Sequence, residues 1–219
     1  MAKKEGISRK MQEHYQNVWE AGNAWDFETS EYEKQRYSYL LDKIKDRHYG
    51  RVLEIGCGSG CFTNLLTAIA DRVVAVDIAP AAIERARRRV AGGGPGTVEF
   101  RVADIMEHDS TPGAPWDLVV LTETIYSLGW LYPFFDIGLF AAQLYGATRE
   151  GGRCLLANTY GHEKDWLLRP WLIDTYRDLF RNVGFRPESQ DIFVGSKEGT
   201  EMQVLVTLFV KESAGDPGR

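Results

Sequence analysis

Three glycines and one acidic residue form the first group in this sequence whose types and spacing could do chemistry. Gly56, Gly58 and Gly60 follow Glu54, with one residue between successive glycines. Glycines at this spacing permit a tight turn and let the backbone approach a ligand, because no Cβ stands in the way. A helix that starts directly after them would point its free amide groups at the same ligand. The segment predicts a ligand-binding loop, and a purely structural turn is the alternative.

The glycine spacing distinguishes two kinds of ligand. A dinucleotide site has the spacing G-x-G-x-x-G, and its third glycine would fall on Cys61. The spacing found here, G-x-G-x-G with an acid two residues before it, resembles the first motif of the class I S-adenosylmethionine-dependent methyltransferases. That resemblance implies S-adenosyl-L-methionine as the cofactor and S-adenosyl-L-homocysteine as its product. It implies that the loop Gly56–Gly60, Cys57 included, lies beside the methionyl portion of the cofactor, with Glu54 near its ammonium group.

Asp77 closes the next predicted strand, 21 residues after Gly56. A carboxylate at this position can accept hydrogen bonds from both ribose hydroxyls of a bound nucleoside. A helix-capping aspartate is the alternative, because Pro80 follows at the first turn of a predicted helix. The spacing and the position at a strand end favour the ribose role.

Two further acids follow the third and fourth predicted strands. Asp104 ends the third strand, and in the family that the glycine motif resembles an acid here binds the exocyclic amine of adenine. Ile78 and Ile105 would then lie on the two faces of the adenine ring. Glu123 follows the fourth strand, where members of that family bind the methionyl part or the methyl acceptor. A solvated loop carboxylate is the alternative for Glu123.

The elements that must position these residues alternate between short apolar strands and helices. Strands are predicted at 51–55, 72–76, 97–102, 117–121, 153–157, 188–194 and 202–211. Helices are predicted at 8–22, 30–47, 61–70, 80–91, 134–148 and 166–182. Ser30 and Glu33 resemble a capping box at the start of the second helix. The alternation predicts a parallel sheet covered on both faces, with ligands at the carboxyl ends of its strands.

The last two predicted strands follow each other without a helix, so they form a β-hairpin around Ser196–Gly199. The fold class is therefore α/β, a Rossmann-like, doubly wound sheet of seven strands. The sheet is mostly parallel, with an antiparallel strand from the C-terminal hairpin. We expect an N-terminal helical lid at residues 1–48, an S-adenosylmethionine-binding domain at 49–212 and a disordered tail at 213–219.

The segment 25–37, with the sequence WDFETSEYEKQRY, is more specific than the glycine loop. It resembles a segment that precedes the first sheet strand in the nodulation-type (NodS-like) methyltransferases, which N-methylate an amino sugar in a chitooligosaccharide signal. The chain departs from their Asp-Pro-Trp at two positions, where it has Asn-Ala-Trp. The resemblance covers roughly residues 23–160 and implies that Trp25 and Tyr32 belong to a lid over the cofactor. A packing role in an N-terminal helix is the alternative for Trp25.

Methyl transfer to an amine needs a group that accepts the proton of the amine and orients its lone pair. The candidates are Glu123, Tyr160 and His162, because the last two follow the fifth strand, where the acceptor should approach. A solvated loop residue is the alternative for His162. Other residues expected to line the acceptor pocket are Tyr126, Trp130, Tyr132, Glu163, Asp165 and Trp166.

Composition and charge limit the partners and the kinds of site. The net charge is −5, from 26 basic and 31 acidic residues, which argues against a nucleic-acid partner and suits a cationic small-molecule acceptor. The three cysteines form no C-x-x-C pair, so they predict neither a disulfide framework nor a zinc site. The sequence also lacks a group of carboxylates that would predict another metal site. No apolar run has the length of a signal peptide or a membrane helix, so we expect a cytoplasmic monomer or homodimer without membrane contact.

The leading interpretation is an S-adenosylmethionine-dependent N-methyltransferase that acts on an amino sugar or aminoglycoside in secondary metabolism, such as antibiotic biosynthesis. Three alternatives stay open: a small-molecule O-methyltransferase, an NAD-dependent oxidoreductase, and a catalytically silent binding module that keeps the cofactor fold. Binding of S-adenosylhomocysteine but not of NAD would separate the methyltransferase interpretations from the oxidoreductase.

Overall fold

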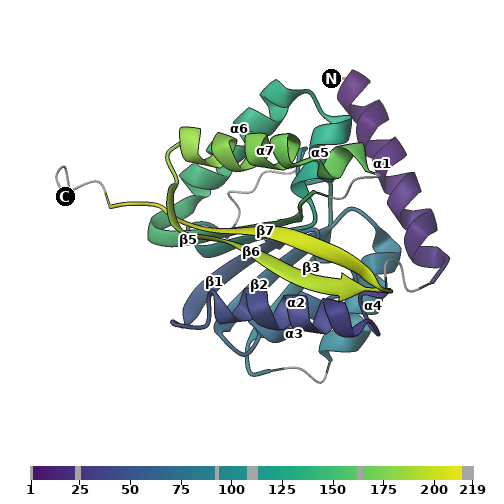
Figure 1. The fold of residues 1–219 in the computed structure, drawn as a ribbon, viewed down its shortest axis with the longest axis horizontal. Helices are drawn as coiled ribbons and strands as arrows, with labels where there is room; N and C mark the ends of the chain where they lie inside the picture. The colour runs from purple at the N-terminus through teal and green to yellow at the C-terminus, as the bar shows by residue number, and fades with distance from the viewer. Residues whose placement is uncertain (1, 23–25, 92–93, 108–112, 162–164, 214–219) are drawn as a thin grey trace.

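A seven-stranded sheet forms the centre of the protein, with the spatial order β3-β2-β1-β4-β5-β7-β6 (Figure 1). The computed structural model describes residues 2–22, 26–91, 94–107, 113–161 and 165–213. The strands are β1 (Tyr49–Ile55), β2 (Ala70–Asp77), β3 (Thr97–Val102), β4 (Trp116–Thr122), β5 (Thr148–Thr159), β6 (Arg186–Lys197) and β7 (Thr200–Val210). The predicted fold class is confirmed.

The first five strands run parallel, and the last two form the predicted antiparallel hairpin. β1 pairs with β2 on one side and with β4 on the other, so the strand order reverses between β1 and β4. β7 pairs antiparallel with both β5 and β6. The reversal creates a crevice at the carboxyl ends of β1 and β4, where sheets of this kind bind their ligands. The glycine loop follows β1 and therefore lies at this crevice.

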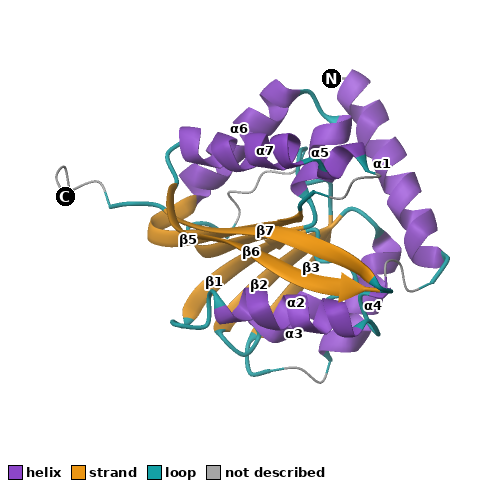
Figure 2. Cartoon of the chain, viewed as in Figure 1, coloured by secondary structure: helices purple, strands orange, loops and turns teal. Residues whose placement is uncertain are grey.

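Helices cover both faces of the sheet (Figure 2), because the strand residues alternate between two separate apolar clusters. The helices are α1 (Ala2–Glu20), α2 (Glu31–Asp42), α3 (Cys61–Leu66), α4 (Pro80–Val90), α5 (Ile125–Leu131), α6 (Phe134–Ala147) and α7 (Pro170–Asn182). One face carries α2, α3 and α4, and the other carries α5, α6 and α7. α1 packs against α4 and lies across the carboxyl ends of the strands.

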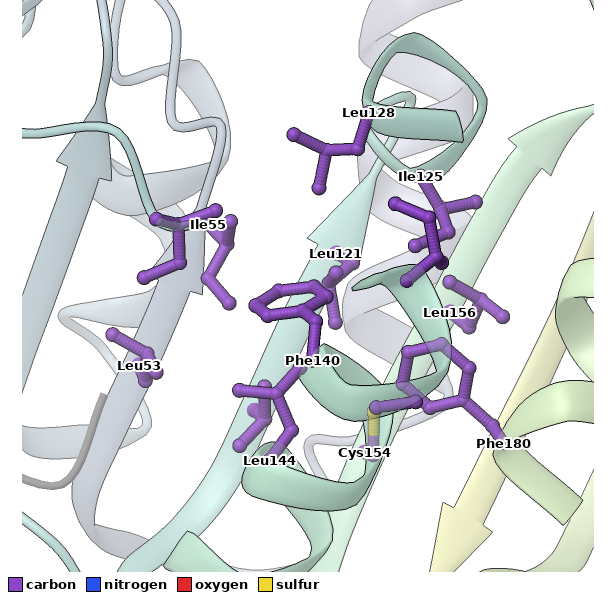
Figure 3. Packing of buried hydrophobic residues seen from close by; sticks show 14 of the residues in the cluster. Leu53, Ile55, Leu121, Ile125, Leu128, Phe140, Leu144, Cys154, Leu156 and Phe180 are labelled. Carbon is purple, nitrogen blue, oxygen red and sulfur yellow. The ribbon is translucent and has the colours of Figure 1, made fainter. Parts of the chain in front are cut away.

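The face under α5, α6 and α7 carries the larger apolar cluster (Figure 3). Leu53 and Ile55 of β1 point into it, and Leu121 of β4 lies beside them. Phe140 of α6 and Phe180 of α7 are almost completely buried there. Each buried ring stabilises the fold by roughly 1.5–3 kcal/mol through the apolar area removed from water. This packing holds the ends of β1 and β4 in place, and those ends carry the glycine loop and Glu123.

Three helices begin or end several residues from the predicted positions. α2 ends at Asp42 rather than at residue 47. α1 begins at Ala2 rather than at residue 8. Ile7 packs against the core, which offsets the cost of Gly6 within a helix. α3 ends at Leu66 rather than at residue 70, because Ala70 already belongs to β2 and pairs with β1. Tertiary contacts therefore decided the start of α1 and the end of α3 against the local helical pattern.

The region predicted as one helix at 166–182 consists of two pieces. Trp166–Leu168 forms a single 3₁₀ turn, and α7 starts only at Pro170. Arg169 between them is extended, as residues before proline usually are. α5 was not predicted, because its seven residues are too few to show a helical period.

Ser30 stands at the N-cap of α2, but the predicted capping box is wrong. The Ser30 side chain makes no capping hydrogen bond. Glu33 turns toward Arg36 instead and accepts a hydrogen bond of 2.8 Å from its Nε. Both side chains are buried, so Glu33 is directed into the protein rather than back to the start of the helix.

The two N-terminal helices that we predicted as a lid pack against different parts of the fold. α1 packs on α4, where Gln16 accepts a hydrogen bond of 3.0 Å from the amide of Ala81. α2 packs along β6, the edge strand at the other end of the sheet. Among the described residues no helix has the length and apolar character needed to cross a membrane. The domain boundaries stay a prediction, and the predicted tail lies outside the described residues beyond Ser213.

Candidate active site

A cavity of about 660 Å³ lies at the carboxyl ends of the parallel strands, at the predicted crevice. The part that we name the glycine-loop end is lined by Glu54, Gly56, Gly58, Asp77, Ile78, Asp104 and Ile105. The part that we name the hairpin end is lined by Tyr32, Glu33, Arg36, Glu123, Lys197 and Met202. α1 borders the cavity with Met11, Tyr15 and Trp19. The volume is typical of sites that bind small molecules and cofactors.

The glycine loop needs glycine at two positions for different reasons. Gly56 has a φ of +76°, and a Cβ added to it would lie 2.3 Å from Oγ1 of Thr124. Gly58 has a φ of +52°, and its Cβ would lie 3.0 Å from the ring of Trp19 on α1. The first glycine lets the ends of β1 and β4 approach each other, and the second lets α1 lie close to the loop. The strand-to-helix turn is confirmed, and its contact with a ligand stays a prediction.

Asp77 holds the glycine loop from the end of β2. Its Oδ2 accepts a hydrogen bond of 2.9 Å from the amide of Gly58, and its Oδ1 accepts one of 2.9 Å from the amide of Ala79. Burial raises the pKa of this carboxyl above its ordinary value, and the backbone hydrogen bonds oppose the shift. The carboxylate of Asp77 thus stabilises the turn before α4, much as the alternative of a helix-capping aspartate predicted. Each oxygen keeps a lone pair for a second donor, so a ribose contact stays compatible with this geometry.

Glu54 is buried at the end of β1, with a side chain that borders the cavity. It accepts a hydrogen bond of 2.6 Å from Oγ1 of Thr63 in α3. Burial raises the pKa of Glu54 to about 8, the hydrogen bond from Thr63 opposes the shift, and the charge of Asp77 adds to it. A cation placed beside this carboxyl would favour its charged form. The predicted ammonium neighbour is a group of that kind.

Asp104 follows β3 and is held by two donors. Its Oδ1 accepts a hydrogen bond of 2.9 Å from the amide of Met106, and its Oδ2 accepts one from the hydroxyl of Tyr132. Ile78 and Ile105 line the cavity at the same end. Tyr132, which we predicted in the wall of an acceptor pocket, therefore contacts the cavity only through Asp104.

Arg36 is the buried cation of the hairpin end, with 1% of its surface exposed. Its Nε and Nη2 lie 2.8 and 2.7 Å from the same oxygen, Oε2 of Glu33. Its Nη1 lies 3.5 Å from Oε1 of Glu123 and has no hydrogen-bond partner within the described structure. Buried donors without a partner are rare in proteins, so Nη1 is suited to a ligand atom that accepts a hydrogen bond.

Glu123 follows β4 and is bound on three sides. Its two carboxylate oxygens lie 2.9 and 3.1 Å from the amide of Thr159, and Oε2 accepts a hydrogen bond of 3.0 Å from the hydroxyl of Tyr126. Its φ of +54° costs a residue with a side chain roughly 1–3 kcal/mol. Burial raises the pKa of Glu123 above its ordinary value, and the charge of Arg36 opposes the shift. A carboxyl group with a raised pKa takes up a proton more readily than an ordinary one.

The tip of the β6–β7 hairpin brings Lys197 and Met202 to the cavity. The Nζ of Lys197 lies 3.6 Å from Oε1 of Glu33. The ring of Tyr32 packs against Phe193 of β6, with 5.9 Å between the ring centroids. The hydroxyl of Tyr32 is buried and has no hydrogen-bond partner among the residues that the structure describes. The hairpin end thus combines two cations, two carboxylates and a buried hydroxyl.

The structure brings some, but not all, of the other predicted acceptor residues to the cavity. Those that line it are Tyr126, Trp130 and Asp165. The hydroxyl of Tyr160 donates a hydrogen bond of 3.2 Å to Asp174 of α7, and Tyr160 does not line the cavity. Trp166 is largely exposed. Trp25, His162 and Glu163 lie outside the described residues, so their roles stay predictions. No group of three or more potential metal ligands occurs within the described part of the chain.

Sequence reasoning missed Arg36, Glu33 as its partner, and Lys197. Arg36 and Glu33 lie in the segment 25–37 and are three residues apart in a helix, which puts them on one face. That spacing is a signal that could have found the pair. Lys197 carries no such signal, because only the packing of α2 on β6 brings it near Glu33.

Comparisons of the sequence with known proteins show relatives over about half of the chain. The family described as Nodulation protein S (NodS) matches residues 9–130. Nodulation protein S of Bradyrhizobium diazoefficiens is 35% identical over 105 residues, which are 48% of this chain and 48% of that protein. Nodulation protein S of Rhizobium tropici is 31% identical over 110 residues, 50% of this chain and 44% of that protein. The chain thus spans about half the length of the curated relatives it matches.

A solved structure shares the whole fold. It is the crystal structure of the N-methyltransferase NodS from Bradyrhizobium japonicum WM9 in complex with S-adenosyl-L-homocysteine. The TM-score is 0.75 at 17% identity, over 93% of this chain and 99% of that one, so the likeness concerns the fold. The family match itself runs from α1 through the glycine loop to α5, and it includes Asp77, Arg36 and Glu123. The resemblance of segment 25–37 is therefore confirmed, and the chain belongs to the Nodulation protein S (NodS) family.

Proposed function

We propose that this protein is an S-adenosylmethionine-dependent methyltransferase that acts on an amine. One observation carries the proposal: the glycine loop and Asp77 share a single cavity with the buried, unpartnered Nη1 of Arg36. A ligand that carries both a ribose and a carboxylate would satisfy these groups together. S-adenosylmethionine has both, and membership of the NodS family supports the same assignment.

The nucleoside half of this cofactor fits the glycine-loop end. Asp77 would accept hydrogen bonds from the ribose hydroxyls through the lone pairs that its amide partners leave free. Asp104, which Met106 and Tyr132 hold in place, would accept one from the adenine amine. Ile78 and Ile105 would pack on the faces of the ring.

The methionyl half needs one cationic and one anionic partner. Arg36 would bind its carboxylate through Nη1, and Glu54 would lie near its ammonium group. Tyr37 lies beside both, since its ring is 4.6 Å from the Arg36 guanidinium and its hydroxyl interacts with the charge of Glu54. A buried carboxyl at this place gives the pyrophosphate of a dinucleotide no favourable partner, because it would have to stay protonated beside those negative charges, whereas the ammonium of the methionyl group favours its charged form. This is why we prefer the methyltransferase to the NAD-dependent oxidoreductase.

When bound, S-adenosylmethionine supplies a methyl group on a positively charged sulfur. In the transfer to an amine the N–C bond forms as the S–C bond breaks, and the amine then loses a proton. We assign Glu123 to accept this proton, because burial raises its pKa and it borders the hairpin end. The larger contribution of the protein is orientation of the two reactants, which can supply up to ~7–11 kcal/mol.

The proposed acceptor is a small cationic amine, of the amino-sugar or aminoglycoside type, in secondary metabolism. The described residues that line the whole cavity include six carboxyl groups (Glu33, Glu54, Asp77, Asp104, Glu123 and Asp165) and two cations (Arg36 and Lys197). That balance favours a cation over an anion or a neutral phenol. The related crystal structure is described as an N-methyltransferase, which supports an amine rather than an alcohol.

Calorimetry tests the cofactor. We expect S-adenosylhomocysteine to bind and NAD not to bind, because the glycine loop and Arg36 fit a carboxylate rather than a pyrophosphate. Asp77→Ala should weaken S-adenosylhomocysteine binding by about tenfold or more, because it removes a charge-assisted contact and releases the loop. Binding of NAD but not of S-adenosylhomocysteine would overturn the proposal in favour of the oxidoreductase.

A screen with labelled cofactor tests the acceptor. The panel spans aminoglycosides, simple amino sugars and phenols, and the products are analysed for the methylated atom. An N-methylated product is expected. An O-methylated product alone would retain the methyltransferase and overturn the amine, and cofactor binding without any turnover would favour the silent binding module.

A further inference from the structure

A third part of the cavity is bordered by α1, α5 and the 3₁₀ turn at Trp166–Leu168. We name it the helical end, and the residues that line it are Met11, His14, Tyr15, Ser127, Leu128, Trp130, Leu167 and Leu168. α1 lies beside α5 (Figure 1), where Tyr15 and Ser127 share a hydrogen bond, and the 3₁₀ turn contacts α5 as well. The proposed cofactor contacts involve none of these residues, so this part of the cavity is open to another ligand group.

α5 leads from the proposed proton acceptor to the edge of the cavity. Glu123 lies two residues before the start of the helix, and Oε2 of Glu123 accepts a hydrogen bond of 3.0 Å from the hydroxyl of Tyr126. Trp130 follows Tyr126 by four residues, so the two side chains lie on one face of α5, about 6 Å apart along its axis. Both line the cavity. A ligand with its amine at Glu123 would therefore reach Trp130 with a neighbouring group.

Trp130 combines two properties that seldom occur together. It lines the cavity, yet 61% of its surface is exposed. More exposed aromatic side chains lie on the adjoining elements, with Phe134 and Phe135 at the start of α6 and Trp166 in the 3₁₀ turn. Exposed apolar side chains that gather at the edge of a cavity are typical of ligand-binding grooves, because water leaves them readily for an apolar ligand.

The polar groups described at the helical end are few, and they already have contacts. The hydroxyl of Ser127 is bonded to Tyr15, and His14 meets the ring of Tyr15 edge-on at 5.1 Å between centroids. Asp165, at the same side of the cavity, accepts a hydrogen bond of 2.9 Å from the amide of Leu167. A hydroxyl-rich group against the leucines of the 3₁₀ turn would lose water without an equal return, which is costly. An apolar group fits this end better.

We propose that the helical end binds an apolar group of the methyl acceptor, and that Trp130 selects for it. The inference rests on the proposed function and names the class of acceptor beyond its amine: an amino sugar linked to an apolar aglycone rather than to further sugars. The amine would lie at Glu123, and the aglycone would cover the indole of Trp130. Contacts of this kind, away from the reacting nitrogen, supply binding energy that can orient the amine for the transfer.

Trp171 provides a matched reference for Trp130. Its exposed fraction is 58%, against 61% for Trp130, and it lies in the first turn of α7 close to the 3₁₀ turn. It does not line the cavity. Because the two indoles are almost equally exposed, loss of either one changes unspecific adsorption of apolar molecules by a similar amount. Only the loss of Trp130 should change binding inside the cavity.

The test uses calorimetry with two β-glycosides of D-glucosamine, one with a methyl and one with an n-octyl aglycone, on the protein saturated with S-adenosylhomocysteine. The octyl glycoside is kept below its critical micelle concentration. It should bind about tenfold or more tightly than the methyl glycoside, because burial of about two methylene groups is enough for this ratio. Trp130→Ala should reduce the ratio to about threefold or less, and Trp171→Ala should leave it unchanged. The β-1,4-linked disaccharide of D-glucosamine should bind no more tightly than the methyl glycoside.

The outcomes separate the inference from the proposed function. Equal affinities of the two glycosides for the wild type would overturn the inference, as would a ratio that Trp130→Ala leaves intact or that both tryptophan variants reduce equally. So would the failure of both glycosides to bind. A disaccharide that gains as much as the octyl glycoside, and loses this gain in Trp130→Ala, would show that Trp130 stacks on a sugar instead.

S-adenosylhomocysteine binding is measured for each variant as a separate readout. Its absence throughout, the wild type included, would count against the proposed function, and the glycosides are then measured on the ligand-free protein. Trp130→Gln, with thermal unfolding of every variant, provides a second test should the alanine variant unfold, and it should reduce the ratio in the same way.

Discussion

The glycine-loop end and the hairpin end of the cavity satisfy their polar groups in different ways. At the glycine-loop end the carboxylates of Glu54, Asp77 and Asp104 all accept hydrogen bonds from neighbouring protein groups. At the hairpin end the hydroxyl of Tyr32 and Nη1 of Arg36 are buried without such partners in the described structure. The first end is therefore organised before any ligand binds, whereas the second reaches full hydrogen bonding only with a ligand in it.

Removing the central cation of the hairpin end should have the largest effect on stability. Arg36→Met leaves Glu33 and Glu123 buried without their shared partner, so we expect the free energy of unfolding to fall by about 3–5 kcal/mol. Urea denaturation followed by circular dichroism measures this. The control is Arg181→Met, which breaks an exposed pair with Asp178 and should cost at most about 1 kcal/mol. Equal losses in the two variants would show that charge does not hold the hairpin end together.

Glu54, at the glycine-loop end, should make the free energy of unfolding change by a few kcal/mol with pH. Its pKa is raised from 4.5 to about 8 by burial in the folded protein. As the pH rises from 4.5, the unfolded chain loses this proton first, so the free energy of unfolding falls until the pH passes about 8. Glu54→Gln should remove that fall and be more stable than the wild type at pH 8. The free energy of unfolding of both proteins is measured at a series of pH values. The same dependence on pH in the two proteins would contradict the conclusion that Glu54 is a buried, protonated carboxyl.

The difference between the two ends also decides how much of the site could be predicted from the sequence. Gly56, Asp77 and Asp104 each lie at the end of a strand or within two residues of it, and a parallel sheet brings the ends of its strands together. The hairpin end has no such rule. Arg36 and Lys197 come from elements near opposite ends of the chain, and only the packing of α2 on β6 joins them.

The same reasoning applies to the fold. Strand positions were predictable, because apolar runs of about six residues bounded by glycine and proline have few other interpretations. Helix details failed where a tertiary partner competed with a local one. Glu33 could have reached back to the start of α2, but the buried guanidinium of Arg36 is the stronger partner for its carboxylate. Local patterns contain no information on such a competitor.

Close packing of the glycine-loop end should make it intolerant of a side chain at Gly56. Gly56→Ala introduces a Cβ 2.3 Å from Oγ1 of Thr124 at a φ of +76°, so we expect a loss of about 1–3 kcal/mol in the free energy of unfolding. S-adenosylhomocysteine binding, measured by calorimetry, should weaken with it. Gly146→Ala in α6 is the control, because its Cβ would meet nothing within 4 Å and the helix should gain roughly 0.5–1 kcal/mol. A tolerated Gly56→Ala would mean that the glycine-loop end is less rigid than its contacts indicate.

The smallest expected effect distinguishes the two ends by its sign. Tyr32→Phe removes a buried hydroxyl that has no partner among the described residues, so the ligand-free protein should become more stable by about 1 kcal/mol. Tyr126→Phe removes a hydroxyl that donates a hydrogen bond of 3.0 Å to Glu123, so the same change of side chain should cost about 1 kcal/mol. Both are read from thermal unfolding of the ligand-free proteins. Opposite signs are expected if the hydroxyl of Tyr32 has no partner in the ligand-free protein. Destabilisation of similar size in both variants would show that the hairpin end is as fully hydrogen-bonded as the glycine-loop end.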